Sequence, residues 1–201
     1  MPHIVLLGDS IFDNAPYVPG EPAVIEQLRA LLPENWQATL LAVDGDVTAD
    51  IGEQLRGLPE DATHLAISSG GNDALGQLQF LEAPTDTLLT ALAQLAQMRD
   101  AFQSDYREML GQVCGLGRKV TVCTIYDAIP DLPNSLRTAL CLYNDVILLE
   151  AARMGVPVID LRLLCTEQAD YSTVSPIEPS ATGGEKIVAG IVDACLRRAG
   201  A

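Results

Sequence analysis

The chain has 201 residues, of which 48% are hydrophobic and 19% are charged, a balance typical of a globular protein with a substantial core rather than of a disordered one. Its 12 lysines and arginines are outnumbered by 27 aspartates and glutamates, which gives a net charge of −15. Such a surface repels phosphate backbones and anionic lipid head groups, so we expect neither nucleic acid nor a membrane as a partner.

The chain begins directly with an apolar run at Ile4, without a charged leader. No apolar run approaches the roughly 18 residues that a membrane span needs. The five cysteines are widely spaced, form no CxxC pair and lie far along the chain from both histidines, which argues against a zinc site. We therefore predict a cytoplasmic protein with reduced, mostly buried thiols and with no metal or cofactor.

Short apolar runs alternate with longer helical patterns along the whole chain. This alternation predicts an α/β fold with a five-stranded parallel sheet between two helical layers, in a single domain over residues 1–201. The predicted strands are His3–Gly8, Thr39–Val43, His64–Ser68, Lys119–Tyr126 and Pro157–Leu161. The predicted helices are Ala23–Leu32, Ala49–Arg56, Thr87–Leu116, Ser135–Met154 and Gly183–Ala199.

The helix over Thr87–Leu116 has the clearest periodicity. Its apolar residues recur every three or four positions and predict one continuous apolar face, in which Met98 is a core residue rather than a functional one. The members of this face are Leu88, Leu92, Leu95, Met98 and Phe102. We expect Thr85 or Asp86 to cap its start, and the glycines at 115 and 117 to end it. The segment Gln77–Thr85 before it is expected to border a cleft but to be too short to define a pocket.

Residues suited to catalysis follow three strands in succession. Ser10, in Gly8-Asp9-Ser10, comes after the first strand, where a hydroxyl is exposed beside free backbone amides. Gly45 follows the second strand and permits close approach of the backbone, and Asn72, in Gly70-Gly71-Asn72-Asp73, follows the third. Ligands of open parallel sheets gather at the carboxyl ends of the strands, so we expect these residues to share one cleft.

These motifs resemble those of the SGNH (GDSL) hydrolases. The resemblance extends over nearly the whole chain and implies a flavodoxin-like SGNH hydrolase fold, with Ser10 as nucleophile and with Gly45 and Asn72 in the oxyanion hole. It also implies a carboxylic ester or another acylated small molecule as substrate. Around the same loops, we predict that Asp9, Asp13 and Asp73 contribute to substrate binding. No metal is expected at these carboxylates, since aspartates in such places ordinarily form turns and caps.

The last motif departs from the family. Where the family has an aspartate and, three residues later, a histidine, this chain has Ser175 and Glu178, within an otherwise intact frame of Pro179, Ser180 and Gly183. The two histidines present, at positions 3 and 64, are predicted at the amino ends of strands, away from the cleft. A carboxylate is a weaker base than imidazole by about two pKa units, but burial raises its pKa, and it needs no aspartate to fix a tautomer.

Three functions follow from this pattern. The first is a serine esterase in which Glu178 replaces the histidine base. The second is a weak or inactive hydrolase-fold protein that binds an acyl or glycosyl ligand. The third is a nucleotide-binding or phosphoacceptor domain of flavodoxin type. It fits the sheet, but the loop after the first strand has neither a GxGxxG nor a Walker motif, and the charge of −15 argues against polyanionic ligands.

Overall fold

The structure is a computed structural model that describes residues 1–81 and 83–196. Its centre is a five-stranded sheet in which every strand pairs in parallel, in the order β2-β1-β3-β4-β5. The strands are β1 (His3–Gly8), β2 (Gln37–Leu40), β3 (His64–Ser68), β4 (Lys119–Cys123) and β5 (Val158–Ile159). The predicted α/β fold with a parallel sheet is confirmed.

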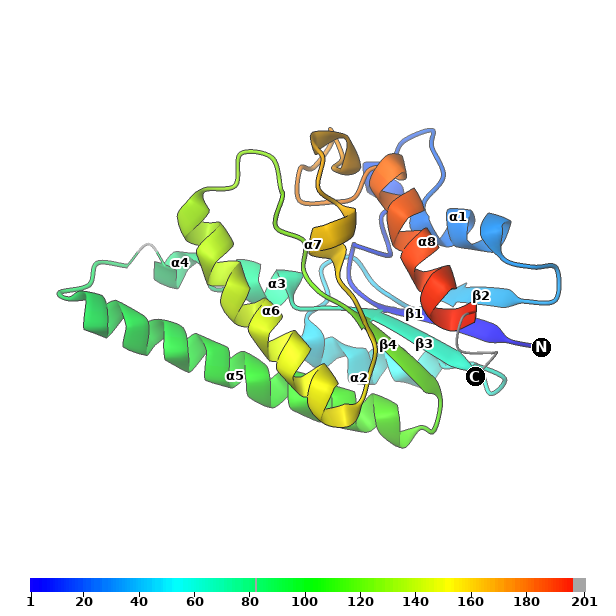
Figure 1. Cartoon of the computed structure of the whole chain (residues 1–201), viewed down its shortest axis with the longest axis horizontal. Helices are drawn as coiled ribbons and strands as arrows, with labels where there is room; N and C mark the ends of the chain where they lie inside the picture. Colours follow the sequence, from blue (N-terminus) through cyan, green and yellow to red (C-terminus); the bar gives the residue numbers. More distant parts are fainter. Residues whose placement is uncertain (82, 197–201) are drawn as a thin grey trace.

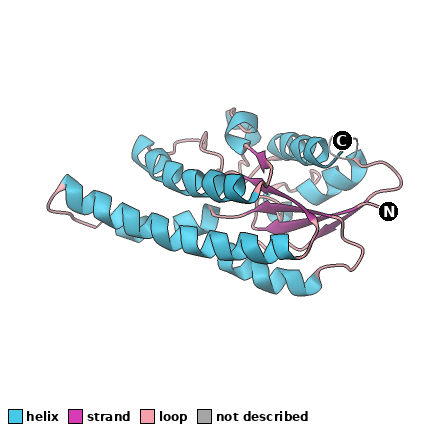
Figure 2. Ribbon diagram, turned by 60° about the horizontal axis from the view of Figure 1, so that its bottom comes forward, coloured by secondary structure: helices cyan, strands magenta, loops and turns pink. Residues whose placement is uncertain are grey.

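Alternate residues of the central strand β1 point to opposite faces of the sheet. Ile4 and Leu6 belong to the core under helices α1 (Val24–Leu31) and α8 (Ala181–Leu196), whereas Val5 and Leu7 pack toward α5 (Leu88–Gly115) and α6 (Asn134–Met154). Both faces are covered, so all six residues of β1 are buried. The three layers are visible in Figures 1 and 2.

Several predicted boundaries are wrong. The strand predicted to reach Tyr126 ends at Cys123, because the Thr124 hydroxyl takes over the local hydrogen bonding by donating to Asp160 and accepting from Leu161. Instead of one helix over 49–56 there is a short α2 (Ile51–Gln54) between two 3-10 turns. Three short helices were not predicted: α3 (Gly71–Leu75), α4 (Leu78–Leu81) and α7 (Leu161–Leu164). The predicted end of the last helix at position 199 lies outside the described residues.

The apolar face predicted for α5 is buried only in its second half. Phe102 is 4% exposed, but Leu88 is 77% and Leu92 is 52% exposed, because the first half of α5 extends beyond the sheet (Figure 1). The helix is capped by Thr87, whose hydroxyl accepts the N–H of Thr90, and not by Thr85 or Asp86. No helix among the residues described has the length and apolarity that crossing a membrane requires.

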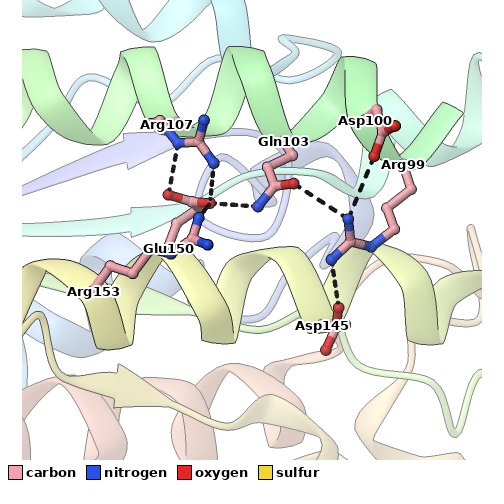
Figure 3. Close-up of polar contacts among 7 residues, drawn as sticks. All are labelled: Arg99, Asp100, Gln103, Arg107, Asp145, Glu150 and Arg153. Carbon is pink, nitrogen blue, oxygen red and sulfur yellow. Dashed lines mark hydrogen bonds and ion pairs between the residues drawn. The ribbon is translucent and has the colours of Figure 1, made fainter. Parts of the chain in front are cut away.

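A polar cluster joins α5 to α6 (Figure 3). Glu150 of α6 is 2% exposed and accepts two hydrogen bonds from Arg107, at 3.0 and 2.8 Å, and one each from Gln103 and Arg153. The hydrogen bonds from Arg107 lower the pKa of Glu150 to about 2. The cluster therefore fixes the spacing of the two helices whose other ends form one wall of the cavity described below.

Candidate active site

At the carboxyl end of β1, the backbone at position 8 has a conformation that only glycine allows, and Ser10 follows two residues later. Gly8 has φ +125°, and a Cβ there would lie 1.7 Å from the carbonyl oxygen of Ser68 on the neighbouring strand β3. The side chain of Gln54 holds both polar groups of this glycine, accepting its N–H at 2.8 Å and donating to its carbonyl at 2.7 Å. The chain then turns sharply into Asp9 and Ser10, both buried.

A largely apolar cavity of about 270 Å³ opens beside Ser10. Because β1 and β3 are neighbours, Ser10 and Asn72 line the same cavity, and Glu178 joins them from the loop before α8. Its apolar walls come mainly from α3, α4, α5 and α6, with Leu78, Leu95, Met98, Leu136 and Leu140 among the lining residues. The cleft predicted at the carboxyl ends of the strands thus contains four of the predicted residues: Asp9, Ser10, Asn72 and Glu178.

Glu178 is held rigidly beside Ser10. Its N–H donates to the carbonyl of Ser175 at 3.0 Å, its own carbonyl accepts from Ser172 at 2.8 Å, and the preceding carbonyl accepts from the hydroxyl of Tyr126 at 2.7 Å. The side chain is 5% exposed, and its Oε2 has no hydrogen-bond partner. Burial raises the pKa of Glu178; the hydrogen bond with the Ser10 hydroxyl opposes this shift, and the charge of Asp44 adds to it. A buried carboxyl group of increased basicity therefore lines the same cavity as Ser10.

Asp9 is a second buried carboxyl group at the cavity. It is 3% exposed and accepts one hydrogen bond, from the N–H of Ile11 at 3.1 Å. Burial raises the pKa of Asp9 to about 8, and the charges of Glu178 and Asp73 act in the same direction. At neutral pH Asp9 is therefore protonated, and it places no second negative charge beside Glu178.

Asn72 and Gly45 belong to two loops that are joined by a hydrogen bond. The side-chain amide of Asn72 donates one hydrogen to the carbonyl of Asp46 at 2.9 Å, which leaves its second N–H available for a ligand. Gly45, in the turn just before Asp46, has φ +89° and is exposed. It borders the site through this contact, but it does not line the cavity.

The other two aspartates predicted to bind substrate have partners within the chain. Asp13 accepts the N–H of Asp44 at 3.0 Å and so joins the loops that follow β1 and β2. Asp73 accepts both the N–H and the hydroxyl of Thr48 at 3.0 Å. Neither lines the cavity, so the geometry supports loop positioning for both, and their contact with substrate stays a prediction.

Neither histidine is near the site. His3, at the start of β1, is bonded to Asp61 and Thr39, and His64, at the start of β3, packs against Trp36 with ring centroids 5.3 Å apart. Both begin strands whose opposite ends form the site. Among the residues described, no three histidine, cysteine, aspartate or glutamate side chains are grouped so as to hold a metal ion.

The sequence-based prediction missed the apolar wall. Met98, predicted to be core, lines the cavity, as do Gln77, Leu78 and Leu81 from the segment expected to be too short to define a pocket. A second hollow of about 370 Å³ adjoins the cavity between α5 and α6. The two share Leu81, Leu95, Met98, Leu136, Ala139 and Leu142. The signal that could have revealed this wall is the nearly uncharged, leucine-rich stretch from 74 to 98.

Comparison with known proteins gives a family match over most of the chain. Residues 6–185 match the model of the GDSL-like Lipase/Acylhydrolase family, a span that includes all the site residues named above. No curated protein is matched by the sequence.

Solved structures with the same fold include several hydrolases. A lipase/acylhydrolase from Enterococcus faecalis is 22% identical, with a TM-score of 0.70 and coverage of 98% of this chain and 97% of that one. An extracellular lipase from Streptomyces rimosus is 20% identical, with a TM-score of 0.69 and coverage of 96% and 100%. An acetyl xylan esterase from Geobacillus stearothermophilus is 17% identical, with a TM-score of 0.68 and coverage of 96% and 93%. At these identities the likeness establishes the fold alone.

Proposed function

The chain belongs to the GDSL-like lipase/acylhydrolase family, and from this premise we propose that it hydrolyses carboxylic esters with Ser10 as nucleophile and Glu178 as base. The observation that carries the proposal is the position of the buried Glu178 carboxyl group in the wall of the cavity that Ser10 also lines, where the Ser10 hydroxyl acts on its pKa. A base must be within hydrogen-bonding reach of the proton it removes, and its pKa must lie near the working pH. Glu178 lines the same cavity as Ser10, and burial raises its pKa above the ordinary value of a glutamate.

In the first half of the proposed reaction, the Ser10 oxygen attacks the ester carbonyl while Glu178 takes the hydroxyl proton. The resulting oxyanion accepts hydrogen bonds from the N–H groups of Ser10 and Gly45 and from the free N–H of Asn72. Donors of this kind are each worth roughly 10²–10³ in rate. Glu178 then returns the proton to the departing alcohol, and the acyl group stays on Ser10.

In the second half, water attacks the acyl-serine and Glu178 takes the proton of that water. Collapse of the second tetrahedral intermediate releases the carboxylic acid, and Ser10 regains its proton from Glu178. The carboxylate needs no aspartate to fix a tautomer, and its backbone is held by hydrogen bonds on both sides. This accounts for the serine at position 175, where the family has an aspartate.

We place the acyl group of the substrate in the apolar cavity. Its volume of about 270 Å³ is near the lower limit of ordinary ligand pockets, and the second hollow between α5 and α6 adjoins it. An apolar acyl chain of medium length suits this space better than a sugar does. All five cysteines are free, which supports the cytoplasm as the proposed compartment, and the charge of −15 supports a small molecule rather than nucleic acid as the partner.

A binding protein without turnover is the second candidate. The observation in its favour is that both histidines lie at the other end of the sheet, so that the family's usual base is missing from the cavity. The buried Oε2 of Glu178, which has no partner in the structure, would then accept a hydrogen bond from the ligand. The two candidates differ in whether Ser10 is ever acylated.

The test is hydrolysis of p-nitrophenyl esters of increasing acyl length, from acetate to dodecanoate, by the wild type, Ser10→Ala and Glu178→Gln. We expect loss of activity in Ser10→Ala and a fall of about 10²-fold or more in Glu178→Gln. The wild-type rate rises with pH as Glu178 ionises, and this rise is absent in Glu178→Gln. Ser104→Ala and Glu34→Gln, both exposed, are matched controls that keep full activity.

A rescue variant separates the chemistry from a folding defect. Combining Ser175→Asp with Glu178→His restores the family's pair, and we expect it to regain activity lost in Glu178→Gln. If the wild type and all variants match the buffer rate while remaining folded by circular dichroism, the esterase proposal is refuted and the binding protein is favoured. Mass spectrometry after mixing with an activated ester then shows whether Ser10 carries an acyl group.

A further inference from the structure

The second hollow lies where α4, α5 and α6 extend beyond the sheet (Figure 1). It has six lining residues in common with the apolar cavity, and all three helices contribute to them: Leu81, Leu95, Met98, Leu136, Ala139 and Leu142. The side chains that end the cavity are therefore the same ones that begin the second hollow. An extended ligand that fills the cavity from Ser10 outward is brought directly to the edge of the second hollow.

Polarity changes along this path. Among the residues described, the charged side chains that line either space are Asp9 and Glu178, and both belong to the end at Ser10. The polar residues that line the second hollow are all neutral: Thr85, Gln94, Ser135 and Thr138. No lysine or arginine of the described chain lines either space, so a charged group on the ligand would have no counter-ion there. The path therefore suits a chain whose far end is uncharged.

An independent observation points to an apolar occupant of the second hollow. Phe80 is 55% exposed and Leu92 is 52% exposed, and both line this hollow. Leu92 belongs to the apolar face of α5, in the half of the helix that extends beyond the sheet (Figure 1). Apolar surface left in water is unfavourable in proportion to its area. An alkyl chain that lies in the second hollow covers both side chains and removes this cost.

We propose that the natural substrate is an ester of a long, uncharged carboxylic acid, whose acyl chain continues from the cavity into the second hollow, and that Ala139 and Ala91 set the longest chain accepted. The inference rests on the proposed function, since hydrolysis releases this chain as the carboxylic acid from ester and water. Ala139 is in the wall that the two spaces share, whereas Ala91 lines the second hollow alone. Both alanines are half-buried, so a larger side chain at either position takes space from the alkyl chain.

The test measures kcat/KM for p-nitrophenyl esters from acetate to dodecanoate. Each methylene group that leaves water for an apolar site raises kcat/KM about fourfold, so the wild-type value should keep rising with chain length. Ala139→Phe should end the rise early and lower the dodecanoate-to-acetate ratio about 15-fold, which corresponds to two excluded methylene groups. Ala91→Phe should end the rise at a longer chain than Ala139→Phe does. Ala96→Phe on α5 and Ala152→Phe on α6 are exposed and outside both spaces, and these matched controls should keep the wild-type ratio.

A pair of isomeric esters decides which part of the substrate occupies the path. Ethyl decanoate and decyl acetate contain the same atoms, but they carry the long chain on opposite sides of the ester group. We expect the wild type to prefer ethyl decanoate, and Ala139→Phe to lower this preference. If Ala139→Phe instead lowers activity toward decyl acetate alone, the path holds the alcohol and the inference is overturned. An unchanged dodecanoate-to-acetate ratio in Ala139→Phe overturns it as well.

Binding separates this inference from the proposed function. Alkan-2-ones resemble the acyl side of an ester but cannot be hydrolysed, and calorimetry with Ser10→Ala measures their affinity from pentan-2-one to undecan-2-one. We expect the affinity to rise about fourfold per methylene group, and the rise to end sooner when Ala139→Phe is added. If no ester is hydrolysed but this binding pattern is found, the esterase proposal fails and the acyl path stands. An affinity that does not grow with chain length, or that grows equally with and without Ala139→Phe, overturns the acyl path even where esters are hydrolysed.

Discussion

Replacement of Asp9 by asparagine tests whether the buried carboxyl group at the cavity is protonated in the native state. Burial raises the pKa of Asp9 from 3.8 to about 8. Between these two pH values the unfolded chain has lost the proton, while the native protein keeps it. Unfolding then releases a proton, so the free energy of unfolding falls as pH rises through this window and is constant below it.

The size of the effect follows from the width of the window. Each pKa unit corresponds to about 1.4 kcal/mol, so Asp9 lowers the stability of the wild type by up to about 4 kcal/mol between pH 4 and pH 7. Asparagine has the shape of the protonated carboxyl group and keeps an oxygen that accepts from the N–H of Ile11, but it does not titrate. Asp9→Asn should therefore be the more stable protein at pH 7, and the two should converge near pH 4.

Urea unfolding at intervals from pH 4 to pH 8, followed by circular dichroism, measures this difference. Asp86→Asn, at an exposed position, is the control for the loss of one formal charge and should run parallel to the wild type. Subtracting the Asp9→Asn curve from that of the wild type removes the contribution of other carboxyl groups such as Glu178 and Asp73, apart from their coupling to Asp9. If the Asp9→Asn and wild-type curves run parallel from pH 4 to pH 8, Asp9 titrates as an ordinary aspartate and the reasoning is refuted.

Three further substitutions probe the elements that position the site. Glu150→Gln should lower the free energy of unfolding by about 2 kcal/mol at pH 7. The pKa of Glu150 is lowered to about 2 in the folded protein, so the wild type loses this contribution as pH falls from 4.5 toward 2. Equal urea midpoints of the wild type and the variant at pH 7 would contradict the role of the α5–α6 cluster. Gly8→Ala should lower the free energy of unfolding by more than about 3 kcal/mol, because the added Cβ meets the backbone of β3. The control Gly20→Ala, at φ +84° with open space around it, should lower it by about 1 kcal/mol. Thermal melts measure the difference, and similar melting temperatures of the two variants would disprove the steric argument. Tyr126→Phe removes the hydroxyl that donates to the Ile177 carbonyl and should lower the free energy of unfolding by about 1 kcal/mol. It should also lower kcat more than it raises KM. An unchanged kcat would show that this contact does not position the base.

The local sequence pattern was sufficient to predict the parallel sheet and the location of the candidate site. The strand runs are short, apolar and β-branched, so the existence of all five was predicted, although the strand expected over Thr39–Val43 is Gln37–Leu40 and the one expected over Pro157–Leu161 is only Val158–Ile159. Their regular alternation with helices implied parallel pairing. Glycines and polar residues directly after strands marked Ser10, Gly45 and Asn72 because turns at strand ends need just these residue types. Boundaries were less predictable: β4 ends where Thr124 finds a side-chain partner in Asp160, the residue that follows β5 and caps α7, and that contact spans 36 residues of sequence.

The exposed half of α5 shows a different limit. Leu88 and Leu92 continue the periodicity of the buried residues, and nothing in that periodicity tells a helix how far the sheet beneath it extends. The same holds for the aspartates of the site. Asp9, Asp13 and Asp73 are alike in sequence context, but one lines the cavity and two hold loops.

Residue type and spacing alone determined that this chain forms a parallel α/β sheet, that a serine, a glycine and an asparagine follow successive strands, and that a glutamate stands in the place of a histidine. Only the tertiary structure decided that Glu178 is buried in the cavity that Ser10 lines, that burial raises the pKa of Asp9, and that the walls of this cavity are apolar. The reason is physical: spacing along the chain sets backbone conformation, but desolvation, charge coupling and cavity shape depend on which distant segments pack together.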